Sequence, residues 1–196
     1  MKKKVIAGLL LSSCVFGVAM PAFAETKTVD GEGTTNIPVN GTLGADNKNP
    51  VAEIPEGEEG WINVTVPTTT VFYNTTTVKD IKSPTYDIVN NSGRPVDVSI
   101  STFTAGANTG MDLSSLNLFV TIGSTNTSVV TAGSVVNFST TPVLLAKLAN
   151  NEGHLEKGDG GSEASTATFT YSGTANTTSE LLPTYTMTLK FDAVAW

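Results

Sequence analysis

The sequence predicts an all-β protein, an antiparallel β-sandwich of the immunoglobulin-like type with about nine or ten strands. Short runs of alternating apolar and polar residues recur along the chain, as in Val96, Val98 and Ile100. A period of two places one residue type on each face of a strand. Turn-forming clusters such as residues 90–95 separate these runs, and no long amphipathic helical pattern occurs.

The first half of the predicted sandwich begins with residues 61–66, in which Ile62, Val64 and Val66 alternate with polar neighbours and Trp61. Pro67 interrupts this pattern, and a further strand is expected at 70–73. The Asn-Asn-Ser-Gly-Arg-Pro loop then joins two strands, at 85–89 and 96–101, into a pair that needs a second sheet to cover its apolar face.

The second half continues with a well-alternating run at 116–122, which ends at Gly123-Ser124. A short hairpin follows, with strands at 129–130 and 135–138 around the turn at 132–134. Residues 142–148 have helical residue types but are too short to nucleate a helix alone, so a strand is expected. After a glycine-rich loop at 150–165, strands at 167–173 and 185–191 close the sandwich. The expected core is Ile62, Val64, Val66, Phe72, Ile88, Val96, Val98, Ile100, Leu118, Val120, Phe169, Leu189 and Phe191.

Residues 1–24 have the organisation of a secretory signal peptide: three lysines, an apolar stretch, and Ala22-Phe23-Ala24 before Glu25. Cys14 follows Leu-Ser-Ser, as in a lipoprotein box, and its lipidation stays open. Residues 25–60 are interpreted as a lead-in with a possible edge strand at 36–43, because Pro38 cannot donate to a ladder, and an acidic loop. Residues 61–196 are expected to form the sandwich domain.

Cleavage after Ala24 would remove three lysines and no acidic residue, so the net charge would change from −7 to about −10. No basic cluster remains, and nucleic acid and anionic membranes are therefore not expected partners. The mature form is expected to have no membrane span. It would also have no cysteine, which excludes disulfides and a thiol nucleophile and favours a Gram-positive exported protein.

Candidate catalytic and metal-binding groups are few. His154 is the single histidine, and no nucleophile, zinc or phosphate-binding motif is present, so we expect no catalytic residues, no metal and no cofactor. Two loops could supply oxygen ligands for calcium, and neither has the spacing of a known calcium loop. An isopeptide bond between a buried lysine and an asparagine is a further alternative. The residues concerned are Asp46, Asn47, Asn49 and Glu53, then Glu152, Glu156 and Asp159, and the lysines Lys79, Lys82, Lys147 and Lys190.

The basic start with VIAGLLLSS and PAFA, the strand INVTVPT, the block SPTYDIVNNSGRPVDVSISTF and the closing YTMTLKF together resemble the WxL-domain and WxL-like cell-surface proteins of low-GC Gram-positive bacteria. The resemblance implies a sandwich fold, a cell-surface location and a non-catalytic role. The Trp-x-Leu motifs are not intact, since Phe191 and Ala193 stand where the second would be. Attachment to peptidoglycan, which the family associates with these motifs, is therefore not carried over residue by residue.

These observations predict a secreted structural or adhesion protein that associates non-covalently with peptidoglycan or with other surface proteins. The alternative is a secreted hydrolase of the camelysin kind. Trp61 and Trp196 are the candidate surface-binding residues, because aromatic side chains bury a large area at low entropic cost.

Overall fold

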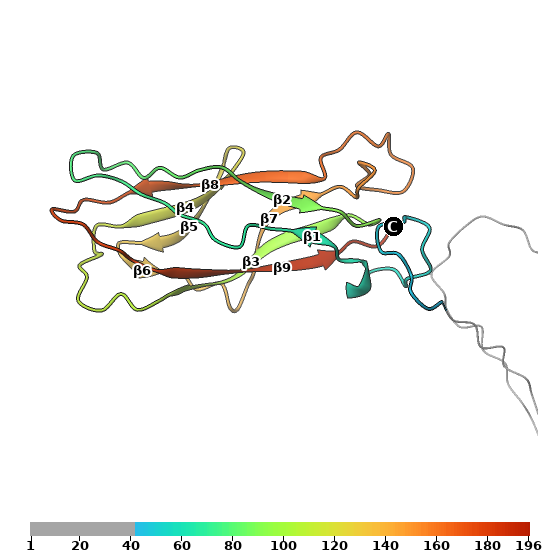
Figure 1. The fold of residues 1–196 in the computed structure, drawn as a ribbon, viewed down its shortest axis with the longest axis horizontal. Coiled ribbons are helices and arrows are strands. Elements are labelled where there is room, and N and C mark those ends of the chain that lie inside the picture. Colours follow the sequence, from blue (N-terminus) through green and yellow to red (C-terminus); the bar gives the residue numbers. More distant parts are fainter. Residues whose placement is uncertain (1–41) are drawn as a thin grey trace, which may run out of the picture. The chain divides into compact units, whose positions relative to one another are not determined.

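The computed structural model describes residues 42–196, which form two antiparallel sheets packed against each other (Figure 1). The larger sheet has six strands in the order β1-β2-β8-β4-β5-β6, and the smaller has three in the order β7-β3-β9. Every paired strand is antiparallel to its neighbour. The prediction of an all-β antiparallel sandwich is confirmed.

In this part of the chain the single helical element is a 3₁₀ turn, η1 (Glu59–Trp61). The strands are β1 (Val64–Thr65), β2 (Tyr86–Asn90), β3 (Val96–Ala105), β4 (Asn117–Ile122), β5 (Thr125–Thr131), β6 (Ser134–Val135), β7 (Val143–Leu148), β8 (Thr166–Thr174) and β9 (Tyr185–Ala193).

Most strands with clear alternation form where the sequence predicts them. A hairpin forms between β5 and β6, although its second strand is Ser134–Val135 and not the predicted 135–138. Its two turn residues, Ala132 and Gly133, both have positive φ, at 47° and 76°, as the tight turn of a two-residue hairpin requires. β5 begins earlier than predicted, because Gly123 turns the chain so that Ile122 opposes Thr125. The polar start of β5 carries no apolar alternation; backbone pairing and a hydrogen bond from Thr121 Oγ1 to Asn126 Oδ1 join it to β4.

Two predicted strands are wrong in extent. Of residues 61–66 only Val64–Thr65 pairs with β2, and Trp61 ends the 3₁₀ turn instead. Residues 70–73 form no strand, and only Tyr73 makes an isolated bridge, to Lys82. This segment bonds a tyrosine side chain instead of a neighbouring strand. The hydroxyl of Tyr86 accepts from Val71 N at 2.7 Å and donates to Val71 O at 3.2 Å.

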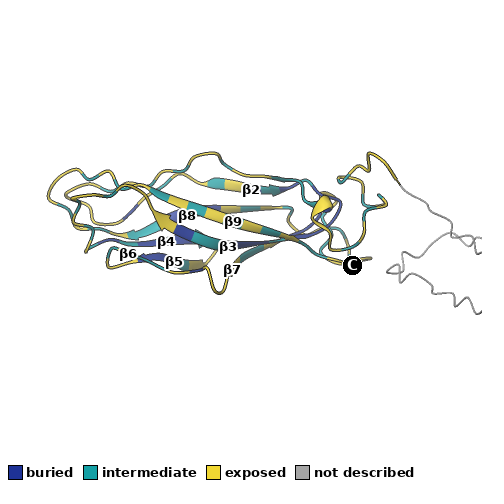
Figure 2. Ribbon diagram, turned by 90° about the horizontal axis from the view of Figure 1, so that it is seen from below, coloured by how far each residue is buried: buried dark blue, intermediate teal, exposed yellow. Residues whose placement is uncertain are grey.

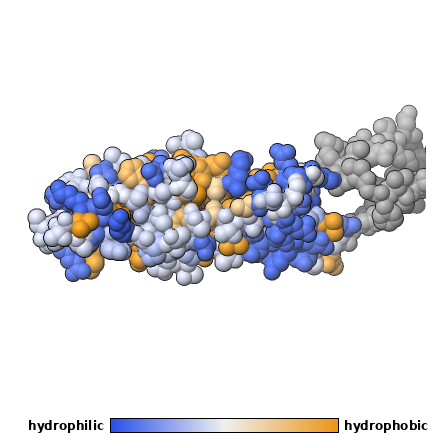
Figure 3. Space-filling view, turned by 90° about the horizontal axis from the view of Figure 1, so that it is seen from above, coloured by the Kyte–Doolittle hydropathy of each residue, from blue (hydrophilic) through white to orange (hydrophobic). Residues whose placement is uncertain are grey.

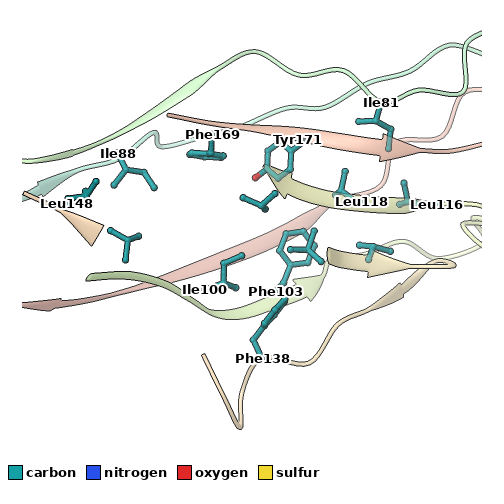
Figure 4. Close-up of a cluster of buried hydrophobic side chains, with 14 of the residues drawn as sticks. Ile81, Ile88, Ile100, Phe103, Leu116, Leu118, Phe138, Leu148, Phe169 and Tyr171 are labelled. Carbon is teal, nitrogen blue, oxygen red and sulfur yellow. The ribbon is translucent and has the colours of Figure 1, made fainter. Parts of the chain in front are cut away.

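The core lies between the two sheets, where Ile100 and Phe103 of β3 face Phe169 and Tyr171 of β8 (Figure 4). Seven predicted core residues are fully buried: Ile88, Val96, Val98, Ile100, Leu118, Val120 and Phe169. Four are partly buried against them: Val64, Phe72, Leu189 and Phe191. Val66 is 39% exposed and Ile62 is not in the core cluster, so the prediction is wrong for these two, which flank the short β1.

The predicted signal peptide at 1–24 and residues 36–41 of the possible edge strand lie outside the described residues. Residues 42–60 form no strand, yet they contact the sandwich. Gly93 N donates to Asn47 O at 2.7 Å, and Asn63 Nδ2 donates to Asn47 Oδ1 at 3.1 Å. The acidic loop is therefore attached to the loop between β2 and β3, which positions the site described next.

Candidate functional site at the Arg94 stack

The guanidinium of Arg94 lies between two tryptophan rings. Arg94 Cζ is 4.2 Å from the ring centre of Trp61 and 4.7 Å from that of Trp196. Both contacts are cation–π interactions, which gain strength where water is excluded. Arg94 is 5% exposed and Trp61 is fully buried, so the stack is largely desolvated. We call these three residues the Arg94 stack.

Glu56 neutralises the buried guanidinium. Arg94 Nε donates to Glu56 Oε2 at 2.8 Å, and Arg94 Nη2 donates to Oε1 at 2.5 Å. Arg94 Nη1 donates to the carbonyl of Pro50 at 2.7 Å. The hydrogen bond from Arg94 holds the pKa of Glu56 below its ordinary value, and the backbone N–H of Trp196 acts in the same direction. A two-point pairing of this kind is the geometry in which a buried arginine is stable.

The loop that carries Arg94 is buried because side-chain amides bond its backbone. Asn90 Nδ2 donates to the carbonyls of Arg94 at 2.9 Å and Ala149 at 2.8 Å, and Asn90 Oδ1 accepts from Ser92 N at 2.9 Å. An apolar side chain at position 90 would leave these buried carbonyls without partners. The polar loop that the sequence predicts between β2 and β3 is thus the framework of the Arg94 stack.

Beside the stack, the half-buried ring of Trp196 borders a surface hollow of about 550 Å³, which we call the Trp196 hollow. Val194 N donates to Pro95 O at 2.9 Å and ties the segment after β9 to the β2–β3 loop. Lys147 Nζ lies 3.0 Å from Asp97 Oδ2 at the hollow. The hollow is lined by Pro95, Asp97, Lys147, Leu155, Glu156, Lys157, Val194, Ala195 and Trp196.

The two tryptophans named as candidate binding residues therefore come together, because both rings contact the guanidinium of Arg94. Trp61 has no exposed surface and donates its indole N–H to Pro55 O at 3.1 Å, so it acts as a packing residue here. Trp196 is partly accessible and lines the hollow. Arg94 was not predicted as a site residue, although it is the single arginine of the chain and lies in the Asn-Asn-Ser-Gly-Arg-Pro loop.

His154 and Asp159 belong to the loop beside Trp196. The ring of His154 packs edge-on against that of Trp196, with centres 6.1 Å apart, and its Nδ1 hydrogen-bonds Asp159 Oδ1. The carboxylate of Asp159 accepts backbone N–H groups of Leu155, Glu156 and Gly161, and these bonds, that from Glu156 foremost, lower its pKa. Asp159 therefore shapes the loop that borders the Trp196 hollow.

The remaining candidates are dispersed. Residues 42–196 contain no group of three or more His, Cys, Asp or Glu side chains that could hold a metal ion. Asp46 Oδ1 accepts from Lys48 N, a turn contact within the proposed calcium loop. The four lysines considered for an isopeptide bond are all exposed, so none has the burial that this reaction needs. Within the described residues, no helix is long and apolar enough to cross a membrane.

Comparison of the chain with protein-family models, with curated proteins and with solved structures finds no match.

Proposed function

We propose that the protein is a secreted, non-catalytic cell-surface module that binds peptidoglycan non-covalently through the Trp196 hollow. The observation that carries the proposal is the position of Trp196, which lines a hollow with charged residues. Its ring is held in place by the contact with Arg94. Sites for small ligands typically combine an apolar surface with a few polar groups that set orientation.

The chemistry of the hollow suits a polymer of sugars and short peptides. The apolar C–H face of a sugar ring packs on an aromatic ring, and the polar groups around the ring need donors and acceptors. Lys147 and Lys157 can donate to ligand carboxylates, and Asp97 and Glu156 can accept from hydroxyl or amino groups. A ring already held by Arg94 loses little conformational freedom when it binds.

The test is retention on purified peptidoglycan of the wild type and of Trp196→Ala. Tyr73→Ala is the matched control, because Tyr73 is also aromatic, is 59% exposed and is not part of the hollow. We expect Trp196→Ala to lose about tenfold or more in affinity, as for a residue worth about 2 kcal/mol in an interface, and Tyr73→Ala to bind like the wild type. Thermal unfolding of each variant checks that the fold is retained.

Equal retention of Trp196→Ala and wild type would remove Trp196 from the site, and no retention of the wild type would reject the wall polymer as ligand. Fractionation of cells into wall, membrane and medium tests the location. The alternative, a camelysin-like hydrolase, would be supported by chelator-sensitive proteolysis that His154→Ala abolishes.

A further inference from the structure

The two sheets of the sandwich differ in their number of strands, and β9 is an edge strand of the three-stranded sheet. β9 pairs with β3 along its whole length, and no other strand of residues 42–196 pairs with its second edge. β9 is nine residues long. A long edge strand presents unpaired N–H and C=O groups and is a template for another strand.

A groove of about 1140 Å³ lies along this open side, bounded by residues 66–76 and by β9. The inward-facing residues of β9, among them Met187, Leu189 and Phe191, are only half buried, and Figure 2 shows the resulting alternation of exposed and intermediate residues along β9. Val71 and Leu182, both lining the groove, are 55% and 69% exposed. On the face shown in Figure 3, apolar side chains reach the surface in patches between hydrophilic ones.

The opposite wall of the groove does not pair with β9. The hydroxyls of Tyr86 and Tyr171 hydrogen-bond Val71 and Thr70, and so hold this wall against the larger sheet. Tyr185, which also lines the groove, has a buried hydroxyl with no hydrogen-bond partner in the described structure. A buried hydroxyl without a partner costs free energy, and a backbone group entering the groove could satisfy it.

A strand-like segment precedes the described strands in the sequence. In residues 36–43, Ile37, Val39 and Leu43 fall on one face of an alternating pattern. Leu43, the described end of that face, is 99% exposed, so the described residues do not pack against it. Pro38 lacks an N–H and suits a strand that pairs on one edge only.

We propose that residues 36–43 of a second copy of this chain enter the groove and pair with β9, with Ile37 and Val39 packed onto Met187, Leu189 and Phe191.

The direction in which the segment would run along β9 favours a second copy over the chain's own segment. Asn47 O bonds Gly93 N, and Val194 N bonds Pro95 O, so residue 47 and the end of β9 meet at the same loop. The chain's own segment would therefore run parallel to β9, whereas a segment from another copy can run antiparallel, like every other pair in the structure. The contact is head-to-tail and leaves each copy with one free groove and one free segment, so it builds linear assemblies.

The first experiment is analytical ultracentrifugation of the chain beginning at Glu25. The wild type is expected to sediment as oligomers that grow with concentration, and Ile37→Asp/Val39→Asp as a monomer. The matched control is Asn36→Asp/Asn40→Asp, which adds the same charge on the opposite face and is expected to associate like the wild type. A monomeric wild type, or equal association of both double variants, would overturn the proposal.

The second experiment uses the absence of cysteine from residues 25–196. Val39→Cys and Leu189→Cys are prepared as separate proteins, mixed and oxidised, and a disulfide-linked heterodimer is expected. Asn40→Cys replaces Val39→Cys in the control, and less heterodimer is expected because its side chain faces away from the groove. A disulfide that closes within single chains carrying both Val39→Cys and Leu189→Cys, without heterodimer in the mixture, would assign the groove to the chain's own segment and overturn the proposal.

Discussion

Arg94 and Glu56 form a two-point ion pair between the β2–β3 loop and a segment 38 residues earlier in the chain. The same guanidinium contacts Trp61 and Trp196, so one side chain ties together η1, the loop and the segment that follows β9. Because the arginine is buried, the energetic importance of these contacts appears mainly when one partner is removed.

Arg94→Ala is expected to lower the free energy of unfolding by about 3–5 kcal/mol, since it leaves a partly buried carboxylate unpaired and opens a gap between two rings. Chemical denaturation followed by tryptophan fluorescence measures the loss. Lys190→Ala is the control, because the Lys190–Asp192 pair is exposed and such pairs contribute about 0–1 kcal/mol. Similar losses in the two variants would show that the Arg94 stack does not stabilise the fold.

The stability of the protein should depend on the charge of Glu56. Arg94 holds the folded-state pKa of Glu56 below its ordinary value of 4.5. Its contribution is therefore fully present above pH 4.5 and is lost as the pH falls through the lower folded-state pKa. Thermal unfolding between pH 7 and pH 3 should show a larger loss for the wild type than for Glu56→Gln, which is less stable at pH 7.

Asp112 and Asp159 also have lowered pKa values, through hydrogen bonds from Ser114 and from the backbone of Glu156 respectively. Both carboxylates are present in the wild type and in Glu56→Gln, so the difference between the two pH profiles isolates Glu56. Parallel profiles would contradict a charge-dependent pairing of Glu56 with Arg94.

Gly93 is needed where residues 47–50 cross the β2–β3 loop. A Cβ at this position would lie 2.8 Å from the carbonyl carbon of Asn49 and 2.9 Å from the nitrogen of Pro50, and both are backbone atoms. Gly93→Ala should therefore displace residues 47–50 and cost about 1–3 kcal/mol. Gly160→Ala, whose Cβ would meet nothing within 4 Å, should leave the denaturation midpoint nearly unchanged. An unchanged denaturation midpoint for Gly93→Ala would mean that the backbone of residues 47–50 does not pack closely against residue 93.

The strands that could be predicted are those in which a period of two coincides with a buried face. β4 is an example, since Leu118 and Val120 are buried and the residues that alternate with them, Asn117, Phe119 and Thr121, are only partly buried. Residues 70–73 are also β-branched and aromatic, but the prediction of a strand there is wrong, because the hydroxyl of Tyr86 bonds the backbone N–H and C=O of Val71. Local pattern contains no information about partners on other strands, so such a segment cannot be told from a strand by sequence alone.

The candidate site was predicted only in part for a similar reason. Aromatic residues near the ends of the domain drew attention to Trp61 and Trp196, but exposure depends on what covers them. Arg94 brings the two rings together and buries one of them completely. Its burial rests on Glu56, which lies 38 residues earlier and has no signature at short sequence spacing. It also rests on the amide of Asn90, which belongs to the same loop as Arg94.

The final prediction separates the closed side of the core from the open groove. Ile100 on β3 is fully buried, whereas Leu189, its register partner on β9, is only partly buried beside the groove. Ile100→Ala should cost about 2–5 kcal/mol, because it removes packed methyl groups and leaves a cavity that the rigid surroundings fill poorly. Leu189→Ala should cost less, because part of its side chain already contacts solvent and the groove can accommodate the lost volume. Urea denaturation at low protein concentration, where association is weakest, measures both variants against the wild type. An equal or larger loss for Leu189→Ala would mean that the groove is closed in solution, with Leu189 as deeply packed as Ile100.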